Sequence, residues 1–251
     1  MFLASLTDEN QKMLFLHLAR TVTIAEGDLT GLEESLDWTS IAENSQESFS
    51  GKLLQALTSD QEKLKFNALV MELGSEMIFQ GSSRWRATIP YPKPDNYFIE
   101  NYDEHTFLKA FTKAVTGGID STKADPNNKK KVMTKLLDNG IDLGEINQTL
   151  IHFTFALLPE VRKEIMSILV HEAFDEHKTA AENLTLAQRK AIMLELAAVG
   201  NLGGRVDDLE RKVLEAIREK LEVDPVFLEE AEVVVRKINE AALEALELIA
   251  E

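Results

Sequence analysis

The same short pattern occurs twice in this sequence, once near each end. The first copy runs from Ala25 to Glu33 and the second from Leu202 to Glu210, and in both a glycine is third, an apolar residue fifth and a glutamate ninth. A run with helical spacing of apolar residues precedes each copy. Glycine can end a helix by adopting a positive φ, and glutamate stabilises the first turn of the following helix. The repeat therefore predicts two pairs of helices, each pair joined by a turn, which is typical of an all-α protein.

Most of the remaining chain also has helical periodicity. Pro126 and Pro159 mark two helix starts, because proline fits the first turn of a helix. The stretch 81–102 differs, since it contains three of the six prolines and several aromatic residues. We therefore expect an all-α helical bundle with two pseudo-repeated acidic halves and an inserted helical region. The predicted helices span 8–25 (with Thr7 as its N-cap), 51–57, 59–80, 104–116, 126–138, 143–157, 159–181, 185–201, 207–221 and 225–250.

The last predicted helix has apolar residues at alternating steps of four and three, from Phe227 through Val234 and Ile238 to Leu248. A second stripe of Val235, Ala242 and Ile249 lies beside the first and widens the predicted buried face. A stripe of this kind usually closes the bundle to which its own helix belongs. Because the stripe contains several small alanines, it would also allow two copies of the chain to approach closely. The sequence leaves open both closure of the bundle and a homo-oligomer formed through the C-terminal helix.

The two turns resemble those of the TerB-like (tellurite-resistance) family, which read apolar-Asp-Gly-x-apolar-x-x-x-Glu between two helices. The resemblance covers about residues 1–37 and 184–224. This chain departs from the pattern at the aspartate, which is Glu26 in the first copy and Gly203 in the second. The two turns are also 177 positions apart, farther than in a compact domain of that family.

The resemblance implies one helical domain that is split by a long insertion. Its first half would span 1–38, the helical insert with the loop 81–102 would span 39–182, and its second half would span 183–251. For function, the resemblance implies an interaction role in stress-response or defence-associated assemblies.

The chain is acidic, with a formal net charge of -16 over 251 residues. Residues 1–51 and 181–251 each carry a net charge of -7, whereas the middle is nearly neutral. These terminal segments would repel phosphate groups, which argues against direct binding of nucleic acid. A protein partner with a basic surface suits them better, although the charge also serves solubility alone.

The composition of the chain indicates the cellular compartment in which we expect it. The chain has no cysteine, which excludes disulfide bonds and thiolate metal sites. Its apolar runs are shorter than the roughly 20 residues that a membrane-spanning helix needs, so we expect no membrane insertion. The first residues lack the basic segment of a signal peptide. From these features we expect a cytoplasmic protein.

Acidic residues of the two turns are candidate ligands for a divalent cation such as Ca²⁺, which binds several carboxylate and carbonyl oxygens. Helix capping and surface acidity explain the same residues without a cation. No other cofactor is indicated. The candidate ligands are Glu26, Asp28, Glu33, Asp207, Asp208 and Glu210.

A second pattern with metal-ligating residue types occurs in the middle of the chain. His171 and Asp175 are four positions apart and share one helix face, whereas His177 falls on another face, unlike in the zinc-protease motif H-E-x-x-H. The alternatives are a metal-dependent enzyme built on this pair and a polar, solvent-exposed helix face. Phosphate-binding, dinucleotide-binding and serine-hydrolase motifs do not occur, so we expect that the protein is not an enzyme.

The loop 81–102 is the other candidate binding region. Tryptophan, tyrosine and arginine dominate the energetics of protein interfaces, and all three are concentrated here. The alternative is that the aromatic residues anchor a long loop on the bundle. The candidate partner-binding residues are Arg84, Trp85, Arg86, Tyr91 and Tyr97.

Taken together, these features favour a non-enzymatic helical protein-interaction module of TerB-like type. One alternative is an acidic inhibitor or decoy of a mobile element, which would present carboxylates to a basic site on its target. A further alternative is a protein that binds a divalent metal ion.

Overall fold

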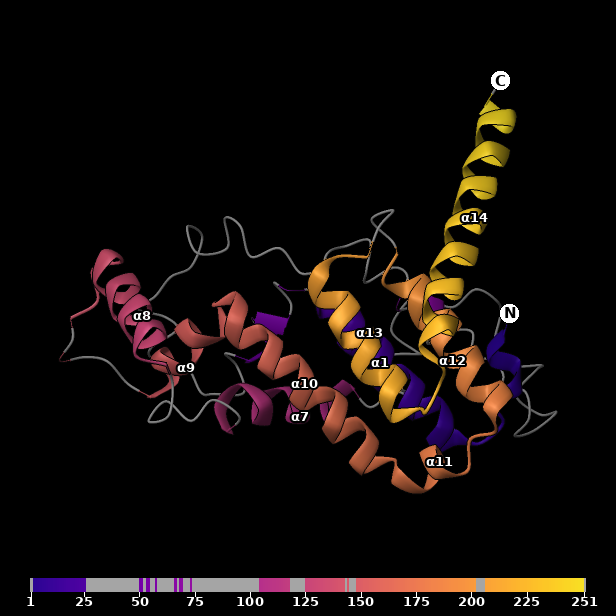
Figure 1. The fold of residues 1–251 in the computed structure, drawn as a ribbon. Helices are drawn as coiled ribbons and strands as arrows, with labels where there is room; N and C mark the ends of the chain where they lie inside the picture. The colour runs from indigo at the N-terminus through magenta and orange to yellow at the C-terminus, as the bar shows by residue number, and fades with distance from the viewer. Residues whose placement is uncertain are drawn as a thin grey trace, which may run out of the picture. The chain divides into compact units, whose positions relative to one another are not determined.

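The computed structural model describes residues 2–25, 104–117, 125–142, 148–201 and 206–250, together with single positions between 50 and 73 and at 144. All regular structure in this part of the chain is helical, which confirms the predicted all-α class (Figure 1). The helices are η1 (Phe2–Ser5), α1 (Glu9–Ala25), α7 (Glu104–Gly117), α8 (Pro126–Asp138), α9 (Gln148–Ala156), α10 (Pro159–Glu176), α11 (Lys178–Glu182), α12 (Leu186–Val199), α13 (Asp208–Lys220) and α14 (Pro225–Ala250).

These helices belong to two compact units. The first contains η1, α1, α11, α12, α13 and α14 with the last residues of α10, and the second contains α7, α8, α9 and α10 up to Glu172. Helices from both ends of the chain therefore pack together in the first unit. The predicted boundary at 38 lies outside the described residues, and the one at 182 lies between α11 and α12 of the same unit.

Helix α1 is the centre of the first unit, where it packs against α11, α12 and α13. The apolar residues Leu14, Phe15 and Leu18 are fully buried, as their helical spacing leads one to expect. Polar residues on the other faces are buried too, among them Lys12 and His17. Buried side chains therefore occur on every face of α1 rather than along one apolar stripe.

Side-chain caps set the starts of α1 and α12. The carboxylate of Asp8 accepts the backbone N–H of Gln11 at 3.1 Å, so Asp8 caps α1 in place of the predicted Thr7. At α12, Thr185 and Gln188 form a capping box in which each side chain binds the other residue's backbone N–H. Both caps satisfy N–H groups that have no partner within their own helix.

The predicted helix 159–181 is in fact two helices. Helix α10 ends at Glu176 and α11 begins at Lys178, with His177 between them at φ -108° and ψ 31°. Neither glycine nor proline marks this break in the sequence. The break changes the direction of the chain at the residue that takes part in the side-chain cluster described below.

Helix α14 packs against α12 and α13 with a face that overlaps the predicted one only in part. Ala231 and Val235 of the two predicted stripes are buried, whereas Val234 and Ile238 are exposed. Leu228 and the acidic residue Glu232 are buried on the same face, and the carboxylate of Glu232 binds Arg211 of α13 at 2.5 Å.

In the second unit, α9 packs against α7 and α8 around Phe107, Phe111 and Phe153. The predicted starts of α8 and α10 at Pro126 and Pro159 are confirmed, whereas α9 begins five residues after the predicted position 143. Two exposed ion pairs link helices of this unit: Lys113–Glu172 at 2.7 Å between α7 and α10, and Lys131–Glu160 at 2.8 Å between α8 and α10.

None of the described helices is long and apolar enough to cross a membrane.

Candidate functional site

The carboxylates of the second repeated turn lie at the start of α13, where they cap the helix. Asp207 Oδ1 accepts the backbone N–H groups of Leu209 and Glu210 at 2.7 and 2.8 Å. Glu210 Oε2 in turn accepts the backbone N–H of Asp207 at 2.7 Å, while the side chain of Asp208 is exposed. Helix capping therefore accounts for Asp207 and Glu210. The first-turn candidates Glu26, Asp28 and Glu33 lie outside the described residues, so cation binding by the two turns together stays a prediction.

The candidate partner-binding residues of the loop 81–102 also lie outside the described residues. They are Arg84, Trp85, Arg86, Tyr91 and Tyr97. Their predicted role is neither supported nor opposed by the structure.

His171 and Asp175 lie on α10, and both are exposed. The described residues contain one group of three potential metal ligands, and it includes neither of them. The group consists of His17, Glu176 and His177, whose donor atoms lie within 4.8 Å of one another.

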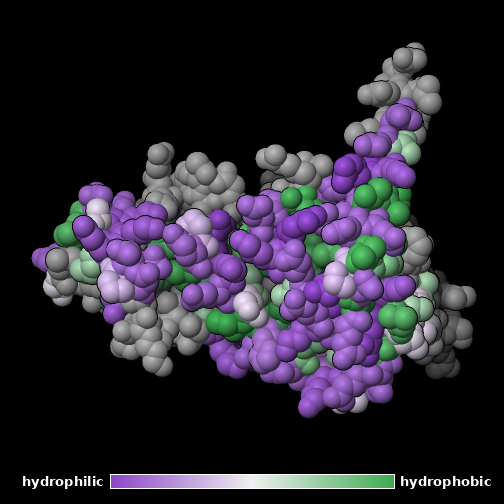
Figure 2. Space-filling model, in the orientation of Figure 1, coloured by the Kyte–Doolittle hydropathy of each residue, from purple (hydrophilic) through white to green (hydrophobic). Residues whose placement is uncertain are grey.

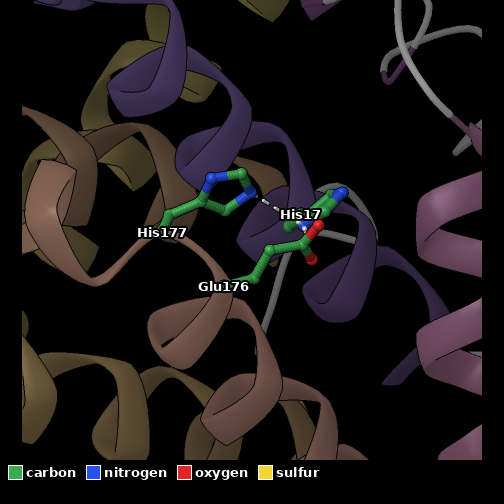
Figure 3. A group of neighbouring side chains, drawn as sticks. All are labelled: His17, Glu176 and His177. Carbon is green, nitrogen blue, oxygen red and sulfur yellow. Dashed lines mark hydrogen bonds and ion pairs between the residues drawn. The ribbon is translucent and has the colours of Figure 1, made fainter.

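This histidine cluster, His17, Glu176 and His177, joins α1 to the junction between α10 and α11 (Figure 3). Nδ1 of His17 lies 3.3 Å from Nε2 of His177 and 3.7 Å from Oε2 of Glu176. The two imidazole rings are tilted by 56° with their centroids 5.1 Å apart. Three donor atoms from two chain segments that are far apart in the sequence thus lie within 4.8 Å of one another.

The environments of the three side chains differ. His17 is buried within α1, His177 is partly buried, and the side chain of Glu176 is 42% exposed. Burial lowers the pKa of His177 below its usual value, because a charged imidazolium loses hydration there. A neutral imidazole is the form that binds metal ions.

The cluster opens on one side to solvent. Glu176 and His177 line a cleft of about 440 Å³, whose other polar residues include Asp8, Asp175 and Lys178. A small ion or solute would therefore have a route to Glu176 and His177.

Sequence reasoning did not find this cluster. His17 and His177 are 160 positions apart, and no pattern in the sequence relates them. One signal was present: His17 lies within the apolar run of α1, where an ionisable residue needs a reason to be buried.

A second feature of the first unit is the outward face of α14, defined here by Val226, Val233, Val234 and Ile238. All four are exposed, and Figure 2 shows hydrophobic surface over α14 bordered by hydrophilic side chains. At 100° per residue, Val226 and Val233 lie opposite the buried face, and Val234 and Ile238 lie along one flank of it.

Models of protein families, curated proteins and solved structures were compared with this chain, and no match was found. The TerB-like resemblance therefore rests on the two turns alone.

Proposed function

We propose that this protein is a non-enzymatic interaction module that binds a protein partner with a basic surface along the outward face of α14. The observation that carries the proposal is the exposure of the described side chains of this helix from Arg236 onward. From Arg236 to Ala241, and again at Glu244, every described side chain is exposed, including that of Ile238.

The length of α14 supports this proposal. It has 26 residues, whereas its neighbours α12 and α13 have 14 and 13. A helix of that length extends about 39 Å, and one of 13 or 14 residues about 20 Å. Helices gain most of their stability from packing rather than from their own propensity, so the overhanging part is suited to a partner.

Apolar exposure and charge indicate the chemistry of that partner. Four large apolar side chains exposed along one helix favour an interaction surface. The same helix also exposes more acidic than basic side chains. The acidic ones are Glu229, Glu230, Glu240 and Glu244, and the basic ones are Arg236 and Lys237. An apolar groove bordered by lysine or arginine would complement this face in both shape and charge.

The resemblance of the two turns to the TerB-like family supports a role in stress-response or defence-associated assemblies. Placement of the protein in such an assembly is part of the proposal and depends on the identity of the partner.

Affinity capture with matched variants tests the proposed function. Wild type, Ile238→Glu and Leu137→Glu are used as baits, because Ile238 and Leu137 have nearly equal exposure, 53% and 52%, in different units. We expect one protein with a basic surface to be retained by wild type and Leu137→Glu and lost from Ile238→Glu. We also expect the purified pair to dissociate more readily as salt rises. Equal retention by all three baits would contradict the proposal, as would a partner without a basic surface.

A second copy of this chain is the alternative partner for the same face of α14. Light scattering on the purified chain would show a dimer that Ile238→Glu converts to a monomer. That result would replace the basic partner with a second copy of this chain.

A further inference from the structure

The histidine cluster lies away from α14 and is not used by the proposed interaction. It combines two imidazole nitrogens and one carboxylate oxygen within 4.8 Å, from α1 and from the junction between α10 and α11. We propose that His17, Glu176 and His177 bind one divalent transition-metal ion of the zinc class.

Two of the three separations between donor atoms are close to the edges of a tetrahedral metal site, and the third is within 4.8 Å. Zinc lies about 2.0–2.1 Å from histidine nitrogen, so two ligands of a tetrahedron are about 3.3–3.4 Å apart. The two histidine nitrogens are 3.3 Å apart, and His17 Nδ1 is 3.7 Å from the carboxylate of Glu176. Without an ion, the same two nitrogens are within hydrogen-bond distance, so the site can keep this geometry before a metal binds.

The donor set selects the class of metal. Imidazole favours zinc, copper, nickel and cobalt, whereas calcium and magnesium prefer sites built from oxygen alone. The chain has no cysteine, so imidazole is the strongest ligand for such ions that it offers. The histidine cluster is thus distinct in chemistry from the predicted calcium ligands of the two turns.

The surroundings of the cluster combine one fixed ligand with one adjustable ligand. Buried His17 is held within α1, whose Thr21 hydroxyl also donates a hydrogen bond to the His17 carbonyl at 2.9 Å. The side chain of Glu176 is 42% exposed, so its carboxylate is the donor that would have to move to complete the site. The cleft beside Glu176 and His177 lets the ion enter and leaves room for water as a fourth ligand.

Binding at this site would join α1 to the junction of α10 and α11 within the first unit. An ion that binds the folded chain and not the unfolded chain stabilises the fold by mass action. The site therefore predicts a rise in melting temperature with zinc.

The experiment uses the purified full-length chain after removal of metals with a chelator. Zinc is titrated by calorimetry into wild type, His177→Gln and the control His171→Gln, which changes an exposed histidine of α10. We expect one zinc per chain and a higher melting temperature for wild type and His171→Gln. We expect the affinity of His177→Gln to fall by more than the roughly 10- to 100-fold that is lost when only a hydrogen-bond partner of a metal ligand is removed.

Cobalt provides an independent readout, because a four-coordinate Co²⁺ site absorbs visible light strongly. Circular dichroism establishes that each variant is folded. If His177→Gln does not fold, Glu176→Gln, which replaces an exposed carboxylate by an amide of similar shape, provides the same comparison. Absence of zinc binding by wild type, or equal binding by wild type and the folded cluster variant, would overturn the proposal.

Discussion

Asp207 and Glu210 cap the first turn of α13 reciprocally. The carboxylate of Asp207 accepts a hydrogen bond from the backbone N–H of Glu210 at 2.8 Å. The carboxylate of Glu210 accepts a hydrogen bond from the backbone N–H of Asp207 at 2.7 Å. Glu210 is also buried, with 1% of its surface exposed. The acidity of this turn therefore has a structural role that is independent of any cation.

Loss of the cap is expected to destabilise the protein. Asp207→Ala should lower the free energy of unfolding by about 1 kcal/mol, because two backbone N–H groups lose their acceptor. Asp207→Asn should retain most of the stability, since asparagine is an equally good N-cap. Urea denaturation measures both, with the exposed Asp208→Ala as the control. An equal loss in Asp208→Ala would show that charge, and not the cap, is responsible.

The orientation of α14 makes a prediction for two adjacent valines. Val235 is 3% exposed and Val234 is 44% exposed. Val235→Ala should cost about 1–2.5 kcal/mol of stability because it leaves a cavity. Val234→Ala should change stability by no more than about 0.5 kcal/mol, as is usual at the surface. If Val234→Ala costs as much as Val235→Ala in chemical denaturation, the buried face includes both valines, as the two apolar stripes of the sequence predict.

Stability should also depend on pH through His152 of α9. This side chain is buried, and its Nε2 accepts an amide N–H from Gln148 at 3.2 Å. Burial lowers the pKa of His152 below its usual value of 6.5, so below that pH the unfolded chain binds more protons than the folded chain. Stability is therefore complete above about pH 6.5 and declines as the pH falls toward the pKa of the folded state.

Thermal melting between about pH 7.5 and pH 5.5 tests this dependence. The pKa of His177 is also lowered by burial and contributes in the same direction. His152→Gln, which cannot be protonated, should flatten the decline without abolishing it. A variant whose melting temperature falls as steeply as that of wild type would show that His152 has the same pKa in the folded and unfolded chains.

The sequence predicts the start of a helix well where one residue type dictates the backbone. Pro126 and Pro159 begin α8 and α10 as predicted, because proline fixes φ and needs no N–H partner. Thr7 and Asp8 are both good caps, so the sequence could not choose between them, and the structure uses Asp8.

Features that depend on contacts between distant residues were not predictable in this way. The buried face of α14 includes Glu232 because Arg211 of α13 binds its carboxylate, and that partner cannot be identified from the spacing of apolar residues. Neither glycine nor proline occurs at the break at His177, so the periodicity of the sequence predicted one continuous helix there. The histidine cluster was missed for that reason, since it depends on this break and on a residue 160 positions away.

Site-specific photo-crosslinking at position 238 tests the proposed interaction most directly. A photoreactive amino acid replaces Ile238 in one variant and the equally exposed Leu137 in another, and both are expressed in the cells that produce this protein. We predict a covalent adduct between position 238 and a protein with a basic surface, and no such adduct from position 137. The absence of an adduct at position 238, the same adduct at both positions, or an adduct only with a second copy of this chain would contradict the account.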